Sequence, residues 1–284
     1  MRSYTGEYEL VIAHDVPAAL ELLACGEEWR PIAGGTDLMV LFNAGKLSYR
    51  NLVSIRRIAE LRAIESDESS VLIGAAATYT QIRASEILQG EFPLLVKAAS
   101  WTGGIANQNR GTLGGNIANA SPAADSAPPL LVYDAEIELQ SQLGVRSIPY
   151  RDFHSSYKRM MMQPDELISR IRLPRRRWTR EYSRKVGARK AQAIAKVCVA
   201  AAATLEDGRM HDVRIAFGSV APIPLRCLRT EECLRGQALG RETIDIAKET
   251  LRSEIQPISD IRSTSDYRLQ VAQNLLQEFL LGLE

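Results

Sequence analysis

Cysteine and histidine are scarce in this chain of 284 residues, which has four Cys and three His. Cys25, Cys198, Cys227 and Cys233 form no CxxC pair and share no repeated spacing. We therefore expect no zinc site, no iron–sulfur cluster and no disulfide framework on this chain. A reducing compartment suits free cysteines, so the sequence favours a cytoplasmic protein.

Several other features are missing. No apolar run approaches the roughly 18 residues of a membrane-spanning helix. The first ten residues, MRSYTGEYEL, contain no apolar signal region, so we expect no secretory signal. A formal net charge of +1 provides no global attraction to nucleic acid or to an anionic membrane. The remaining composition is that of a globular protein with one large domain or two ordinary ones.

A long, almost uncharged segment rich in Gly, Asn, Ser and Ala occupies residues 101–134. It contains the pairs Gly103-Gly104 and Gly114-Gly115, and its side chains are too small to build a core. Such a segment is suited to bringing backbone close to a ligand. An earlier loop, Gly34-Gly35-Thr36, lies between an apolar strand at 31–33 and a helix at 37–43. A strand, a Gly pair and a helix start together offer free N–H groups to an anion.

Each of these features has a purely structural alternative. Thr36 or Asp37 would serve as a helix cap while the glycines form a tight turn. Neither the GxGxxG fingerprint nor a P-loop lysine is present. The loop 112–116, however, repeats the same chemistry, and two such loops favour the pyrophosphate of a dinucleotide. Asp125 is then placed to accept hydrogen bonds from ribose hydroxyls, unless it caps a helix at 126–132.

The remaining pattern predicts an α+β fold. We expect strands at 8–13, 51–55, 71–75, 135–140 and 145–149, and helices at 18–24, 58–64, from Thr78 or Thr80 to 88, at 92–100 and at 126–132. Eight Arg or Lys residues lie between Arg170 and Lys185. This stretch is typical of a solvated connection between domains, or of a basic surface facing a dinucleotide or an acidic partner. It shows no platform of interleaved aromatic residues for stacking bases, which disfavours nucleic-acid binding.

The C-terminal part predicts a second α+β domain. Strands at 194–204 and 211–220 flank the turn Glu206-Asp207-Gly208-Arg209, a strong hairpin signal. Two helices follow at 241–254 and 265–281, and we expect them on one face of the antiparallel sheet. His211 stands alone at a strand start, where a surface role is expected, and no catalytic constellation is present.

Two segments carry a family resemblance. PIAGGTDLMV (31–40) and QNRGTLGGNIANASPAADSAPPLL (108–131) closely resemble the FAD-binding motifs of the flavoprotein subunits of the xanthine dehydrogenase family. This family of molybdenum hydroxylases includes carbon monoxide dehydrogenase. The segments 184–202, 214–226 and 259–268 are similar to later signatures of the same subunits. The resemblance covers essentially the whole chain, with its motifs in the same order.

This resemblance implies the p-cresol methylhydroxylase-type two-subdomain FAD-binding fold over 1–174, with subdomains of about 1–55 and 56–174. A smaller α+β C-terminal domain would occupy 175–284. The FAD would be bound non-covalently, because His14 and Cys25 both lie outside the two loops. The implied pyrophosphate loops are Pro31, Ile32, Ala33, Gly34, Gly35, Thr36, Asp37 and Leu38, and Thr112, Gly114, Gly115 and Asn116. Asp125 would contact the ribose or adenine end, Thr102 and Gly103 would approach the flavin, and Leu167, Ile168 and Lys185 would lie beside the cofactor.

The function implied is that of an electron-transfer subunit. In the family, a large subunit oxidises the substrate at a molybdopterin centre, and a small subunit passes electrons through 2Fe–2S clusters to this FAD. The electrons then reach NAD+ or another acceptor, so this chain needs no catalytic acid or nucleophile. Two alternatives remain: a self-contained FAD oxidoreductase of the same fold, and a scaffold that has lost the flavin.

Overall fold

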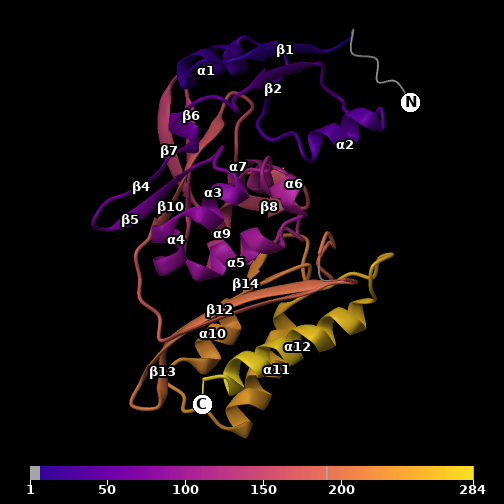
Figure 1. The fold of residues 1–284 in the computed structure, drawn as a ribbon. Helices are drawn as coiled ribbons and strands as arrows, with labels where there is room; N and C mark the ends of the chain where they lie inside the picture. Colours follow the sequence, from indigo (N-terminus) through magenta and orange to yellow (C-terminus); the bar gives the residue numbers. More distant parts are fainter. Residues whose placement is uncertain (1–6, 190, 284) are drawn as a thin grey trace.

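The computed structural model describes residues 7–189 and 191–283. The three larger sheets follow one another in Figure 1: a small N-terminal sheet at the top, a helix-covered central sheet, and a C-terminal sheet at the bottom. Each sheet has its own cluster of buried apolar side chains. None of the helices within these described ranges is long and apolar enough to cross a membrane.

The N-terminal sheet is parallel and has the order β1 (Glu9–Ile12), β3 (Asn51–Ser54), β2 (Trp29–Ile32). Helix α1 (Val16–Ala24) packs against it and is capped by the Asp15 side chain, which accepts the Ala18 N–H at 2.9 Å. Helix α2 (Leu38–Asn43) begins just after the first Gly loop. The apolar faces of α1 and the sheet form one core.

The central sheet is antiparallel and has the order β4 (Ile64–Ser66), β5 (Ser70–Gly74), β10 (Leu167–Pro174), β6 (Glu136–Ser141), β7 (Gly144–Pro149). The strands predicted at 135–140 and 145–149 are confirmed as β6 and β7, which pair as a hairpin. The helices of this part are α3 (Tyr79–Ala84), α4 (Glu86–Glu91), α5 (Pro93–Trp101), α6 (Ile105–Gln108), α7 (Leu113–Ala118), α8 (Ala127–Val132) and α9 (Tyr150–Phe153). A short hairpin of β8 (His154–Ser156) and β9 (Arg159–Met160) follows α9.

Two predictions about the central part are wrong. In place of a helix, residues 58–64 contain a 3₁₀ turn at Glu60–Arg62 and the first residue of β4, because the chain there pairs with β5. The Gly74 N–H donates to Ala63 O at 2.8 Å, and the Ala76 N–H donates to Leu61 O at 2.7 Å. The expected helix from Thr78 to 88 is divided into α3 and α4, because Ser85 leaves the helical conformation and caps α4.

The basic stretch 170–185 is largely not a connection. Its first half is the end of β10, the middle strand of the central sheet, and its second half lies in β11 (Arg180–Val186). Ile171 and Leu173 are buried in the core, whereas Arg172 donates to Glu138 Oε1 at 2.9 Å on β6. Carboxylates on neighbouring strands therefore allow arginines to occupy a central strand.

The C-terminal sheet is antiparallel in the order β11, β12 (Val197–Glu206), β13 (Arg209–Gly218), β14 (Leu225–Arg226). The predicted hairpin turn is confirmed, with positive φ at Asp207 and Gly208. Helices α11 (Arg241–Glu254) and α12 (Ser265–Leu281) also match their predicted bounds, and α10 (Leu228–Leu234) was not predicted. These helices cover one face of the sheet, as expected (Figure 1).

The opposite face of this sheet is covered as well. Ala200, Ala202 and Ala216 belong to the same buried cluster as α8 and the central sheet. Their small side chains let α8 approach β12 and β13 closely. The N-terminal and C-terminal parts of the chain therefore share a continuous apolar junction, and α8 lies in its centre.

Candidate functional site

The two predicted Gly loops lie against each other. Arg110, just before the second loop, donates from Nε to the Gly34 carbonyl oxygen at 3.1 Å. A Cβ on Gly34 would lie 1.9 Å from the Arg110 carbonyl oxygen. Gly34 is therefore required by contact between the loops, and the loops form a single surface although 76 residues separate Gly34 from Arg110.

The first loop has unused hydrogen-bond donors. The backbone N–H groups of Gly34, Gly35, Thr36 and Asp37 find no acceptor among the described residues. Asp37 occupies the N-cap position of α2, yet its side chain makes no capping hydrogen bond. The capping alternative is thus not observed in the structure. Adjacent free N–H groups in a tight loop form an anion-binding concavity, and the positive φ of Gly35 helps to create it.

The second loop differs from the first. The Thr112 side chain caps α7 by accepting the Gly115 N–H at 3.1 Å, and the Gly114 N–H donates to Ala75 O at 2.8 Å. Gly114 is fixed by packing, because its Cβ would lie 2.6 Å from the Cβ of Ala75. Gly115 is exposed, and a Cβ there would meet only the Thr112 hydroxyl within 4 Å. This loop therefore offers an open backbone surface rather than free donors.

Asp125 and Lys185 form a buried ion pair. Lys185 Nζ lies 2.6 Å from Asp125 Oδ2 and also donates to Trp101 O at 3.1 Å. The two side chains are only 9% and 10% exposed, and Asp125 Oδ1 is buried without a hydrogen-bond partner among the described residues. Burial raises the pKa of Asp125 to about 6, against the opposing effect of Lys185. Asp125 does not cap α8, because Ser126 holds that position.

Other predicted residues surround this pair. The Ser126 hydroxyl donates to Asn116 Oδ1 at 2.5 Å, which joins the second loop to the segment of Asp125. The Thr102 hydroxyl donates to Ala98 O at 3.0 Å at the end of α5, and Gly103 follows with a φ of 61°. The structure therefore collects Thr102, Asn116, Asp125 and Lys185 from separate parts of the chain.

Leu167 and Ile168 have a different setting. Both lie at the start of β10, and they are 2% and 4% exposed. Leu167 packs in the N-terminal core and Ile168 in the central core. Their strand, β10, pairs with β5, and β5 ends at Gly74. The next residue, Ala75, contacts Gly114 of the second loop, so Leu167 and Ile168 support the strands behind the loops.

Two residues near the loops were not predicted. Lys158, in the β8–β9 turn, donates to Asn119 Oδ1 at 2.6 Å. Burial lowers the pKa of Lys158, while the Asp37 carboxylate raises it, so this ammonium lies close to the first loop. Tyr79 lies under the second loop, where its backbone N–H donates to Gly111 O at 3.2 Å. A lysine in a turn and a tyrosine in a helix carry no distinctive sequence signal.

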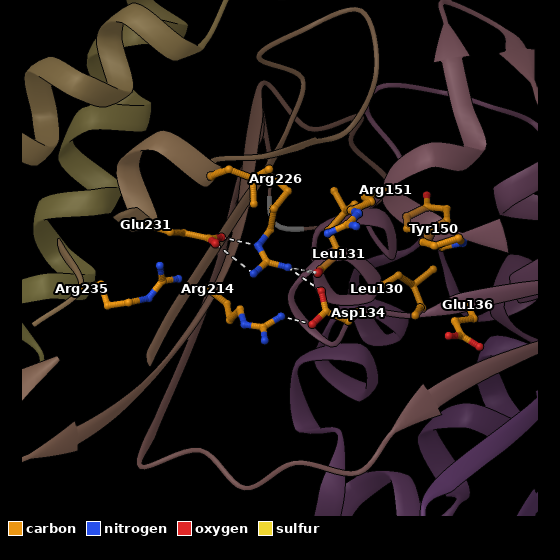
Figure 2. A pocket seen from close by; sticks show the side chains of 13 residues that line it. Leu130, Leu131, Asp134, Glu136, Tyr150, Arg151, Arg214, Arg226, Glu231 and Arg235 are labelled. Atoms are coloured by element: carbon orange, nitrogen blue, oxygen red, sulfur yellow. Dashed lines mark hydrogen bonds and ion pairs between the residues drawn. The ribbon is translucent and has the colours of Figure 1, made fainter. Parts of the chain in front are cut away.

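A separate cavity of about 380 Å³ lies at the junction of the N-terminal and C-terminal parts (Figure 2). Arg226 points between Glu231 and Asp134, and Arg214 reaches Asp134 from the neighbouring strand β13 (Figure 2). Arg226 Nη1 also donates to Leu131 O at 2.9 Å, near the end of α8. The charged groups at the base of this cavity are thus paired with one another, and they join the two parts of the chain.

No group of three or more His, Cys, Asp or Glu that could hold a metal ion occurs in the part of the chain that the structure describes.

The fold and the loops match a known class of flavoprotein. Residues 6–176 match the family model described as the FAD binding domain in molybdopterin dehydrogenase. Residues 182–283 match the CO dehydrogenase flavoprotein C-terminal domain. The chain is therefore an FAD-binding oxidoreductase subunit with the two domains typical of that class.

Individual relatives narrow the class to a family. The chain is 33% identical over 265 residues to the xanthine dehydrogenase FAD-binding subunit of Escherichia coli O157:H7, covering 92% of this chain and 91% of the relative. It is 31% identical to the glyceraldehyde dehydrogenase medium chain of Sulfolobus acidocaldarius, covering 96% of both chains. A structure of carbon monoxide dehydrogenase from Hydrogenophaga pseudoflava superposes with a TM-score of 0.92 at 27% identity, covering 97% of this chain and 96% of the other. The chain thus belongs to the FAD-binding subunits of the xanthine dehydrogenase and carbon monoxide dehydrogenase family of molybdenum hydroxylases.

Proposed function

We propose that this chain holds FAD non-covalently on the two Gly loops and acts as an electron relay within a cytoplasmic complex. The partners would be a large molybdopterin-binding subunit and a small subunit with 2Fe–2S clusters. NAD+ or another acceptor would receive the electrons. Bound FAD supplies reversible uptake and release of electrons, and the protein supplies its binding and orientation.

The observation that carries this proposal is the set of free backbone N–H groups at Gly34, Gly35, Thr36 and Asp37. A pyrophosphate carries several oxygen acceptors, and such donors fit it without a Lys or Arg in the loop. The exposed backbone of Gly115 lies on the adjoining loop, where a close approach meets no side chain but that of Thr112. These free donors and this open backbone support the assignment of the two loops to the diphosphate of FAD.

The remaining site residues have roles that follow from their settings. Asp125 Oδ1 is a buried acceptor without a donor, and a hydroxyl of the ribose or ribityl type would satisfy it. Lys185 fixes the Asp125 carboxylate and ties it to Trp101, next to Thr102 and Gly103, where we place the flavin. Leu167 and Ile168 are almost fully buried in the apolar cores, so they would contact the cofactor only where the edge of a core faces it. We place the domain boundary at 174/175 and the subdomain boundary near 55/56.

The test of this proposal is isolation of the assembly. Affinity purification through a tag on this chain, followed by native mass spectrometry, should give a complex with a molybdopterin-containing large subunit and a 2Fe–2S-containing small subunit. Anaerobic addition of the substrate of the complex should then bleach the flavin absorbance. Isolation of the chain as an active enzyme on its own, with its own organic substrate, would instead support a self-contained oxidoreductase.

A further inference from the structure

Tyr79 presents an unusual polar group beside the proposed cofactor site. Its side chain is 3% exposed, and its hydroxyl oxygen is buried without a hydrogen-bond partner in the described chain. A buried, unpaired hydroxyl costs free energy and calls for a functional explanation. The residue is firmly held, because its backbone N–H donates to Gly111 O and Thr78 forms a β-bridge with Thr112.

The surroundings of this hydroxyl consist of proposed cofactor residues. Burial raises the pKa of Tyr79, the Ser126 and Thr102 hydroxyls beside it act in the opposite direction, and the Asp125 carboxylate raises it further. The aromatic ring lies under the second loop, since a Cβ on Gly111 would be 3.3 Å from Tyr79 Cε2. The hydroxyl therefore lies where the Thr102 segment, the second loop and Asp125 meet.

The available protons in this cluster are few. The Ser126 hydroxyl donates its proton to Asn116 Oδ1, and the Thr102 hydroxyl donates its proton to Ala98 O. Asp125 Oδ1 has no donor in the part of the chain that the structure describes. Among these hydroxyls, only that of Tyr79 has a proton that is not committed to another group, while Ser126, Thr102 and Asp125 all offer acceptors.

We infer that Tyr79 is a positioning residue of the cofactor site, whose hydroxyl donates its one proton to an acceptor among Thr102, Ser126 and Asp125 when FAD is bound. This inference rests on the proposed function. Small rotations of the Thr102 and Asp125 segments around the ligand would bring one acceptor into line with the Tyr79 proton. The hydroxyl thus contributes one hydrogen bond to the liganded site.

This role predicts an uncommon combination of effects for Tyr79→Phe. The ring and its packing are retained, and an unpaired buried hydroxyl is removed, so the thermal stability of the FAD-free protein should be unchanged or higher. FAD should bind about tenfold more weakly, because one hydrogen bond of the liganded site is lost. The absorption bands of the bound flavin should also shift, since Thr102 adjoins the proposed flavin position.

Tyr182→Phe is the matched control. Its hydroxyl is also buried without a partner, but it lies in the C-terminal domain, where its ring packs near Phe279. This variant should match the wild type in FAD affinity and flavin spectrum.

The experiment is a titration of FAD-free wild type, Tyr79→Phe and Tyr182→Phe with FAD, followed by flavin fluorescence, with melting temperatures and visible spectra measured in parallel. Failure of the wild type to bind FAD would overturn the proposed function itself. FAD binding by the wild type with equal affinity and spectrum in Tyr79→Phe would overturn the inference alone. Weaker FAD binding accompanied by a lower melting temperature of the FAD-free variant would also contradict it, because that result indicates a purely structural hydroxyl.

Discussion

The two ends of helix α8 contain ion networks of opposite character. Before its first residue, Asp125 pairs with Lys185 at 2.6 Å and keeps one carboxylate oxygen without a donor. After its last turn, Asp134 accepts hydrogen bonds from both Arg214 and Arg226, and Arg226 also holds Glu231. Both networks cross the junction between the N-terminal and C-terminal parts of the chain. Only the network at the cofactor end is left incomplete.

We attribute a different role to each network: the arginine network stabilises the fold, and the Asp125–Lys185 pair serves ligand binding. A buried ion network stabilises a junction only when its hydrogen-bonding groups are satisfied, and the arginine network comes close to that condition. A network that lacks donors is costly by itself and gains from a ligand that supplies them. We therefore expect variants at the arginine end to change folding, and variants at the loops and Asp125 to change cofactor binding or its electrostatics.

The largest effect is expected from Arg226→Met. The Glu231 carboxylate, 2% exposed, would lose its bidentate partner and remain buried with an uncompensated charge. The free energy of unfolding should fall by about 3–5 kcal/mol, as urea denaturation would measure. Arg235→Met removes an exposed ion pair with Glu232, and this variant should change the free energy of unfolding by less than about 1 kcal/mol. Equal effects of the two variants would show that the buried network does not stabilise the junction.

The next effect concerns the open backbone of the second loop. Gly115→Val should weaken FAD binding by about 100-fold or more, because the new side chain occupies the surface over which the pyrophosphate is proposed to lie. Its Cβ would also lie 2.8 Å from the Thr112 hydroxyl that caps α7. Gly240→Val is a suitable control, since no atom lies within 4 Å of the added Cβ. Full flavin content in purified Gly115→Val would show that the loop assignment is wrong.

A smaller effect should appear in the pH dependence of stability. The pKa of Asp125 is raised to about 6 from 3.8, so its contribution to stability is complete below pH 3.8 and is lost as the pH rises through 6. The FAD-free wild type should therefore gain on the order of 1–2 kcal/mol relative to Asp125→Asn between pH 7.5 and pH 5. Burial lowers the pKa of His154, which acts in the opposite direction, but His154 is present in both proteins. Urea denaturation of both proteins at the two pH values measures this change. The same difference in unfolding free energy between wild type and Asp125→Asn at pH 7.5 and at pH 5 would contradict the assignment.

The regular elements with strong local signals were predictable from the sequence. The bounds of α11 and α12 agree with their apolar periodicity, and the turn at Asp207-Gly208 fixes the β12–β13 hairpin. Strand β10 escaped prediction because its arginines suggest solvent. The Glu138 carboxylate that accepts from Arg172 belongs to another strand, 34 residues earlier in the sequence. Local pattern cannot reveal such a partner.

The candidate site was likewise only partly predictable, because many of its contacts join residues that are distant in the sequence. Adjacent glycines predicted backbone exposure, but Gly34 and Gly114 are required by contacts with Arg110 and Ala75 that only the folded chain creates. The family resemblance placed Asp125 and Lys185 near one cofactor, and the structure adds that they form a buried pair. Tyr79 and Lys158 carry no motif, because their importance arises from unpaired or charged atoms brought close to the loops by tertiary structure.

The central claim is that the free N–H groups and open loops of this chain hold one FAD. The most direct measurement is the visible spectrum of the purified chain, together with chromatography of the cofactor released on denaturation. We expect a flavin spectrum, about one FAD per chain, and complete release without a covalent link. A colourless protein that cannot be reconstituted with FAD would contradict the claim.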